Sequence, residues 1–113
     1  MPHDAVFLGD IVSSARAIAG HIEGLDEGAF VHDRTAYQAV IRELEIIGEA
    51  TKQLSVELRD AHPDIPWKQM AGLRDVLIHA YRKVDLNEVW HIATFEIPRV
   101  LLAVQPLLPP LDA

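Results

Sequence analysis

The sequence predicts an all-α protein that folds as an up-down four-helix bundle. Half of the 113 residues are hydrophobic but only 6% are aromatic, which suits a core of Ala, Leu, Ile and Val between helices better than a sheet. Apolar residues also recur at spacings of three and four along most of the chain, as on amphipathic helices. The length fits one domain, which we place at residues 1–105, followed by a proline-rich C-terminal tail at 106–113.

The first half of the chain predicts two helices. The first covers residues 5–22, with Asp4 as its N-cap, and the glycines and acidic residues of 20–28 predict a polar turn. The second helix begins near Asp33 and continues to Leu58. Gly48 lies in its middle, where either another backbone approaches closely or a glycine is simply tolerated.

The third predicted helix follows a segment that proline interrupts. Pro63 and Pro66 disfavour helix between residues 62 and 66, so Asp64 is expected to cap a helix over 67–82. It is expected to bury Trp67 and the apolar residues that follow it at helical spacing, which are Met70, Leu73, Leu77 and Ala80.

The fourth predicted helix has the clearest start. Asp85 is its N-cap, Glu88 follows three residues later, and Val84 can contact Val89 as a hydrophobic staple. Pro98 predicts a bend further along this helix. The short connections between all four helices predict mostly antiparallel neighbours.

The charge of the chain restricts its partners. A net charge of −7 opposes nonspecific binding to nucleic acid or to an anionic membrane. Residues 59–83 reverse this balance, with five basic residues against three acidic ones, although a solvated helix face produces such a split equally well. The chain has no cysteine, no signal-peptide pattern and no uninterrupted apolar run of about 18 residues. We therefore expect a cytoplasmic protein that contacts no membrane.

The residues best suited to catalysis lie between Arg74 and Tyr81. On a helix, Arg74 and Tyr81 fall within about 20° of each other, and Asp75 and His79 form an i,i+4 pair. Arg74 and His79 are about 140° apart. Cleavage of a phosphodiester needs a cation and a proton-transferring group at one phosphate. A second copy related by a two-fold axis would bring them together, so a catalytic site here favours a homodimer.

Arg74, His79 and Tyr81 form an R-x4-H-x-Y pattern that resembles the signature of the HEPN superfamily, specifically of the HepT-like toxins paired with minimal nucleotidyltransferase antitoxins. The resemblance extends over most of the chain. Residues 37–50, with their Gly-Glu-Ala sequence, resemble the second helix of the family. Residues 64–67 and 70–74 resemble the start of its third helix, and residues 84–90 the start of its fourth.

The resemblance implies a HEPN-like four-helix domain that dimerises through the motif helix and is a metal-independent endoribonuclease. Arg74 and His79 would be catalytic and Asp75 would support them, with no metal or cofactor. A cognate nucleotidyltransferase antitoxin would transfer AMP to Tyr81 and so silence the toxin, because bulk and negative charge in the cleft oppose RNA binding. Asp75 departs from the neutral polar residue that many members carry after the arginine, and its charge would weaken RNA binding unless His79 is protonated.

Other interpretations remain open at this point. The chain could be a non-catalytic helical binding module that docks a nucleotidyltransferase and is modified by it, which the negative net charge favours. It could also be an inert scaffold in which Arg74 to Tyr81 are ordinary surface and packing residues. Metal catalysis has the least support, because the six histidines show no ligand spacing on one helix face.

Overall fold

The computed structural model describes residues 3–73, 75, 77 and 85–109, and these residues form helices and connecting turns without any strand. The long helices are α1 (Asp4–Ile22) and α3 (Arg34–Lys52). A third rod consists of α7 (Leu86–His91), the π-helical turn η1 (Ile92–Glu96) and α8 (Ile97–Val104). The all-α prediction is confirmed. The four-helix bundle remains a prediction, because most of residues 74–84 lie outside the described part.

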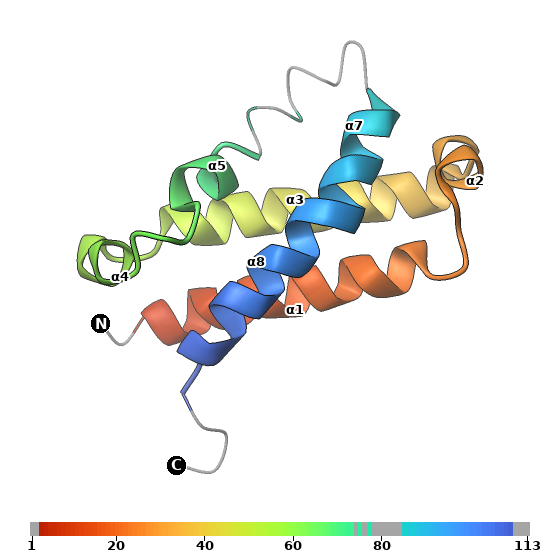
Figure 1. The fold of residues 1–113 in the computed structure, drawn as a ribbon. Coiled ribbons are helices and arrows are strands. Elements are labelled where there is room, and N and C mark those ends of the chain that lie inside the picture. Colours follow the sequence, from red (N-terminus) through yellow and green to blue (C-terminus); the bar gives the residue numbers. More distant parts are fainter. Residues whose placement is uncertain (1–2, 74, 76, 78–84, 110–113) are drawn as a thin grey trace.

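The long elements pack in two layers (Figure 1). Helices α1 and α3 lie side by side in opposite directions, and the rod from α7 to α8 crosses over both. The short helix α5 (Trp67–Ala71) packs against α3. The core between these elements is almost entirely aliphatic, and its fully buried residues include Ile11, Ile18, Val40, Leu44, Ile47 and Val104.

The predicted capping role of Asp4 is wrong. Asp4 lies inside the first turn of α1, and the capping position belongs to His3, whose side chain makes no capping hydrogen bond. The Asp4 carboxylate instead accepts hydrogen bonds from the backbone N–H of Ser55 (2.8 Å) and from its hydroxyl (2.6 Å). The hydroxyl of Ser55 holds the pKa of Asp4 below its usual value. The carboxylate thus joins the start of α1 to a turn 51 residues away.

By length and composition alone, α1 is apolar enough to cross a membrane. Its arrangement is that of an amphipathic core helix. The apolar face of α1 packs against α3 and α8, whereas Asp10, Ser13 and Arg16 are exposed on the other face.

The predicted polar turn leads into a short helix that the sequence interpretation missed. Asp26 accepts a hydrogen bond from the N–H of Ala29 (2.8 Å) and caps α2 (Glu27–His32). Gly24, with φ of 78°, makes the turn that leads into it. Phe30 of α2 is fully buried and its ring centroid lies 5.1 Å from that of Trp90.

Helix α3 begins as predicted and ends earlier. Asp33 caps it by accepting from the N–H of Ala36 (3.0 Å). The helix stops at Lys52, and Ser55 caps the separate helix α4 (Val56–Ala61) by accepting from the N–H of Leu58 (3.1 Å). The predicted continuous helix to Leu58 is therefore wrong, because Ser55 starts a new helix at that point. Gly48 is buried within α3.

Of the N-caps predicted for the third and fourth helices, one is wrong and one is confirmed. Pro66, and not Asp64, occupies the N-cap position of α5, without a side-chain hydrogen bond. Asp85 caps α7 as predicted, accepting from the N–H of Glu88 (3.2 Å), while Val84 lies outside the described residues. The bend predicted at Pro98 stays a prediction, and the structure shows the π-helical turn η1 just before this proline. Proline has no N–H to donate back to the preceding turn, which is where η1 interrupts the α-helix.

Candidate functional site

The described residues include only part of the predicted motif. Arg74, His79 and Tyr81 lie outside the described part of the chain. Asp75 is helical and exposed, between Leu73 and Leu77, which are 8% and 4% exposed. Its pairing with His79 therefore stays a prediction. The segment nevertheless presents Asp75 to solvent and anchors two leucines in the core.

Helix α5 precedes this segment in the sequence and is anchored by buried side chains. Trp67, Met70 and Ile65 are all at least nine-tenths buried. The indole Nε1–H of Trp67 donates to the backbone carbonyl of His62 (2.9 Å), which satisfies the polar atom of a buried ring. Helix α5 also packs against α3, so the residues directly before the motif segment are held against the core.

One groove beside α5, which we call the α4–α5 groove, has a volume of about 900 Å³. Arg59 and Lys68 give it a basic character against the single carboxylate of Asp60. The Nε of Arg59 is buried and has no hydrogen-bond partner among the described residues. The groove is lined by Val56, Arg59, Asp60, Pro63, Ile65, Pro66, Trp67, Lys68, Gln69 and Ala71. In a chain of charge −7, these two cations make the groove locally basic.

A second groove, the α5–α8 groove, lies between α5 and the end of η1 with α8 and measures about 390 Å³. It shares Pro66 and Gln69 with the α4–α5 groove, so the two meet at the start of α5. The remaining lining residues are Asp64, Phe95, Glu96, Arg99, Val100 and Ala103. This groove combines an aromatic ring, a guanidinium, two carboxylates and an amide.

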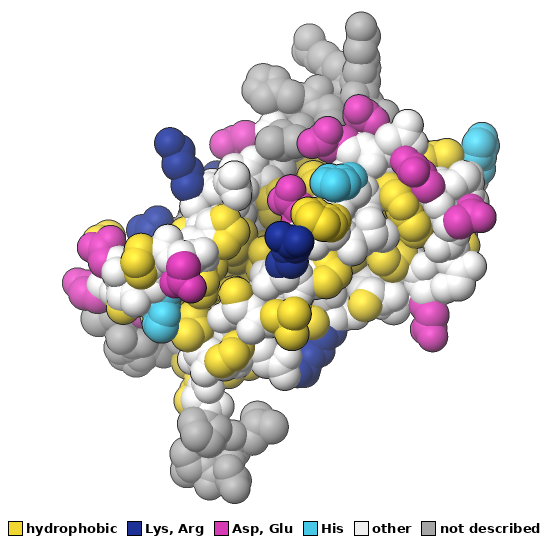
Figure 2. Space-filling view, viewed as in Figure 1, with side chains coloured by type: hydrophobic (Ala, Val, Ile, Leu, Met, Phe, Trp, Pro, Cys, Tyr) yellow, Lys and Arg dark blue, Asp and Glu magenta, His cyan; other side chains and the backbone are white. Residues whose placement is uncertain are grey.

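Phe95 and Arg99 of this groove belong to a stack along one side of the rod. The ring of His91 stacks on that of Phe95, with centroids 5.2 Å apart and planes at 22°. The guanidinium carbon of Arg99 lies 4.1 Å from the centroid of the Phe95 ring, in cation–π geometry. Figure 2 shows a histidine, hydrophobic and basic side chains adjoining over the segment from α7 to α8. All three stacked residues are solvent-exposed, and Phe95 is 48% exposed.

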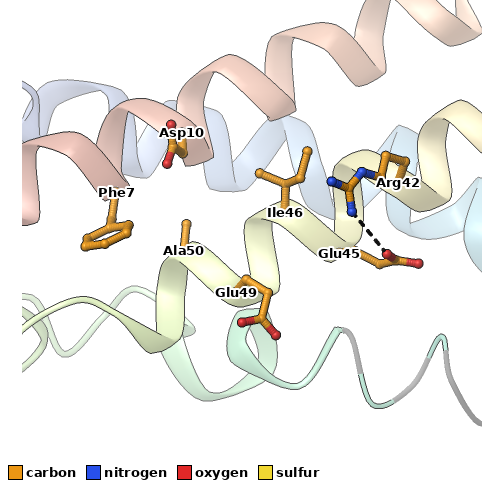
Figure 3. A pocket seen from close by; sticks show the side chains of 7 residues that line it. All are labelled: Phe7, Asp10, Arg42, Glu45, Ile46, Glu49 and Ala50. Atoms are coloured by element: carbon orange, nitrogen blue, oxygen red, sulfur yellow. Dashed lines mark ion pairs between the residues drawn. The ribbon is translucent and has the colours of Figure 1, made fainter.

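A third groove, the α1–α3 groove, has the opposite character (Figure 3). Its volume is about 340 Å³, and Asp10, Glu45 and Glu49 surround a floor that includes Phe7, Ile46 and Ala50. Arg42 is the cation at its rim, 3.6 Å from a carboxylate oxygen of Glu45. Three carboxylates repel phosphate, so this groove suits a cationic partner and not RNA.

The described residues contain no cluster of three or more His, Asp or Glu side chains suited to a metal ion. The grooves themselves were not predicted from the sequence. The stack had a readable signal, since His91, Phe95 and Arg99 follow one another at four-residue spacing. Arg59 and Lys68 were noted only as part of a basic segment, because the sequence does not show that α4 and α5 face a common groove.

Comparison with known proteins places this arrangement in a family. The chain is 39% identical over 106 residues to "Putative RNase MJ0125" of Methanocaldococcus jannaschii, which covers 94% of this chain and 91% of that protein. It is 37% identical over 99 residues to "Putative RNase MJ1380" of the same organism, covering 88% and 91%. It is 40% identical over 92 residues to "Probable ribonuclease HepT" of Thermococcus cleftensis, covering 81% and 84%.

No solved structure is significantly similar to the chain. The profile of the family described as "Ribonuclease HepT-like" matches residues 11–107, which include every groove-lining residue named above except Phe7 and Asp10. The recognition made from the R-x4-H-x-Y pattern is thereby confirmed, and the chain belongs to the HepT-like ribonuclease family.

Proposed function

We propose that this protein is a metal-independent endoribonuclease and the toxin of a type II toxin–antitoxin pair. The observation that carries the proposal is membership of the HepT-like ribonuclease family together with an intact R-x4-H-x-Y pattern in the sequence. The basic α4–α5 groove, lined by Arg59 and Lys68, supports an RNA-facing surface beside α5.

The chemistry assigned to the motif is internal transesterification of RNA. The 2′-OH attacks the adjacent phosphate, which forms a 2′,3′-cyclic phosphate and breaks the bond to the 5′-oxygen of the next nucleotide. Arg74 stabilises the developing negative charge, and His79 transfers a proton so that the 5′-oxygen leaves as a hydroxyl. Asp75 supports His79. A homodimer supplies both groups to one phosphate, because Arg74 and His79 would lie about 140° apart if residues 74–79 formed one straight helix.

The direct test is cleavage of single-stranded RNA by the purified protein in the presence of a metal chelator. We expect cleavage by the parent protein and a loss of at least about a hundredfold for His79→Ala, the usual size of a general acid–base contribution. His3→Ala removes an exposed histidine outside the R-x4-H-x-Y pattern and should leave the rate unchanged. Absence of cleavage by a verified dimer, or equal rates for both variants, would contradict the proposal.

Control of the toxin is assigned to Tyr81. A cognate minimal nucleotidyltransferase antitoxin, in the cytoplasm, transfers AMP from ATP to the phenol oxygen and releases pyrophosphate. The added charge and bulk block the RNA cleft. Mass spectrometry after incubation with this transferase and ATP should show adenylate on Tyr81. Tyr81→Phe should remain unmodified and stay active when the transferase is present. Modification elsewhere, or none, would remove Tyr81 from this role.

A second function is favoured by the α1–α3 groove and by the net charge. In this reading the chain is a non-catalytic binding module that docks the nucleotidyltransferase and is modified by it. The acidic groove with its apolar floor suits a basic protein surface. A tight complex with the transferase combined with no RNA cleavage under any condition would select this function.

A further inference from the structure

We propose that the α5–α8 groove binds a nucleobase of the RNA, with guanine as the preferred base. This inference rests on the proposed function, because it assumes that RNA is the substrate. It assigns a recognition site formed by Phe95, Arg99, Glu96, Asp64 and Gln69, none of which belongs to the R-x4-H-x-Y pattern.

The first argument is the stacking surface. A planar guanidinium has two faces, and the ring of Phe95 covers one face of Arg99 at 4.1 Å. The ring holds the guanidinium in a defined orientation, and the opposite face can stack on a nucleobase, as arginine planes do in single-stranded RNA recognition. The groove of about 390 Å³ beside it falls in the size range of small-ligand sites.

The second argument is the polar lining. Asp64 and Glu96 bring carboxylates to this groove, and neither side chain makes a hydrogen bond or an ion pair within the described residues. A carboxylate only accepts hydrogen bonds, so it selects a base edge that offers donors. Guanine alone presents two adjacent donors, the N1–H and the 2-amino group, on its pairing edge. Gln69 adds an amide that can both donate and accept.

The third argument is continuity with the α4–α5 groove. The two grooves share Pro66 and Gln69, so a strand that places a base against Arg99 can run its phosphates past Lys68 and Arg59. Those cations supply attraction that is independent of sequence, whereas the carboxylates supply discrimination between bases. The mixed charge of the α5–α8 groove thereby fits a base better than a phosphate.

The test is a binding measurement that needs no cleavage. In the His79→Ala background, fluorescence anisotropy would compare labelled oligouridine with the same RNA carrying one central guanosine. We expect the guanosine probe to bind about tenfold more tightly, the discrimination of a good two-hydrogen-bond contact. Arg99→Ala should reduce that preference to less than about twofold. Arg42→Ala, which removes the same charge from the α1–α3 groove, should retain it.

A second pair of variants separates recognition from net charge. Glu96→Gln removes one negative charge and should leave or raise the affinity for plain oligouridine, yet it should lower the guanosine preference about tenfold. Glu45→Gln makes the same change of charge outside this groove and should keep the preference. A guanosine preference that survives both Arg99→Ala and Glu96→Gln would overturn the assignment.

The two proposals fail in different ways. Titration with 5′-GMP and 5′-UMP, followed by amide shifts in NMR, reports on the groove even if the protein cleaves no RNA. Shifts of Glu96 and Arg99 with GMP alone support the base site, whatever the outcome of the cleavage assay. Cleavage without any guanosine preference would keep the proposed function and reject the base site. If Phe95→Ser changes the oligomeric state in solution, this face is an interface between copies and the proposal is wrong.

Discussion

The α1–α3 groove and the paired grooves around α5 lie on the same small bundle but offer opposite chemistry. The first has three carboxylates and one ion-paired arginine over an apolar floor. The second pair has Arg59 and Lys68 in one groove and the Phe95–Arg99 stack in the other. Three carboxylates line each region, but three cations offset them around α5 and a single arginine does so in the α1–α3 groove. A chain of net charge −7 can therefore still present a surface that does not repel RNA.

The largest effect should come from removing the anchor of the α5 side. Trp67→Ala leaves a cavity beneath α5 and should lower the free energy of unfolding by about 3–5 kcal/mol. Trp67→Phe keeps most of the apolar contact and loses the hydrogen bond to His62, with a cost of about 1 kcal/mol beyond the packing change. Urea denaturation measures both. A cost below about 2 kcal/mol for Trp67→Ala would mean that α5 is not anchored by this ring.

Removing the hydroxyl of Ser55, which joins α4 to the start of α1 through Asp4, should have the next largest effect. Ser55→Ala removes the cap of α4 and the hydroxyl bond to Asp4, and should cost about 2 kcal/mol. Asp26→Ala removes a cap that joins nothing else and should cost about 1 kcal/mol. Equal costs would show that the bond to Asp4 adds no stability.

The same link predicts a pH dependence. The pKa of Asp4 is lowered in the folded state, so its ionised form stabilises the fold. This contribution is complete above about pH 4 and is lost as the pH falls through the lowered folded-state pKa. Asp4→Asn should therefore narrow the stability difference between pH 6 and acid solution, as measured by thermal unfolding. An unchanged acid profile would contradict the role of Asp4.

The basic groove should control the salt dependence of RNA binding. Arg59→Gln combined with Lys68→Gln should weaken binding about tenfold at low salt and reduce the slope of log K against log salt by about 1.5. Arg34→Gln combined with Arg42→Gln makes the same charge change on α3. If both pairs lower the slope equally, RNA does not distinguish the two sides of the molecule.

The smallest effect is expected on the acidic side. Asp10→Asn combined with Glu45→Gln should change RNA affinity by less than about twofold, because these residues lie outside the proposed RNA path and salt screens their charges. The same variant should weaken a complex with a basic protein partner. Anisotropy and titration calorimetry would measure the two effects. A large gain in RNA affinity would place RNA near the α1–α3 groove.

Sequence reasoning succeeded where a local pattern determines structure. Asp33 and Asp85 were identified as caps because an N-cap acts within three residues. It failed at Asp4 and Asp64, where residues of the same type and position were used differently. Asp4 found a partner 51 residues away, which no local pattern reveals.

The candidate site shows the same limit. The motif was readable because its residues are close in sequence, and the family it suggested is confirmed. The two grooves around α5 arise from α4, α5 and α8, which are separate in sequence and meet only after packing. Beyond the break at Ser55, Arg59 of α4 and Lys68 of α5 line a common groove. Apolar periodicity continues across that break and therefore did not reveal the groove.

The buried indole of Trp67 also provides an intrinsic fluorescence signal from the α4–α5 groove. The chain has two tryptophans, and they occupy different surroundings: Trp67 lines the α4–α5 groove, whereas Trp90 contacts Phe30 beneath α2. If an RNA strand lies in the groove as proposed, it should alter the emission of Trp67 and leave that of Trp90 as an internal reference. With Trp90→Phe, the intrinsic fluorescence of the protein becomes a label-free signal from one wall of the groove.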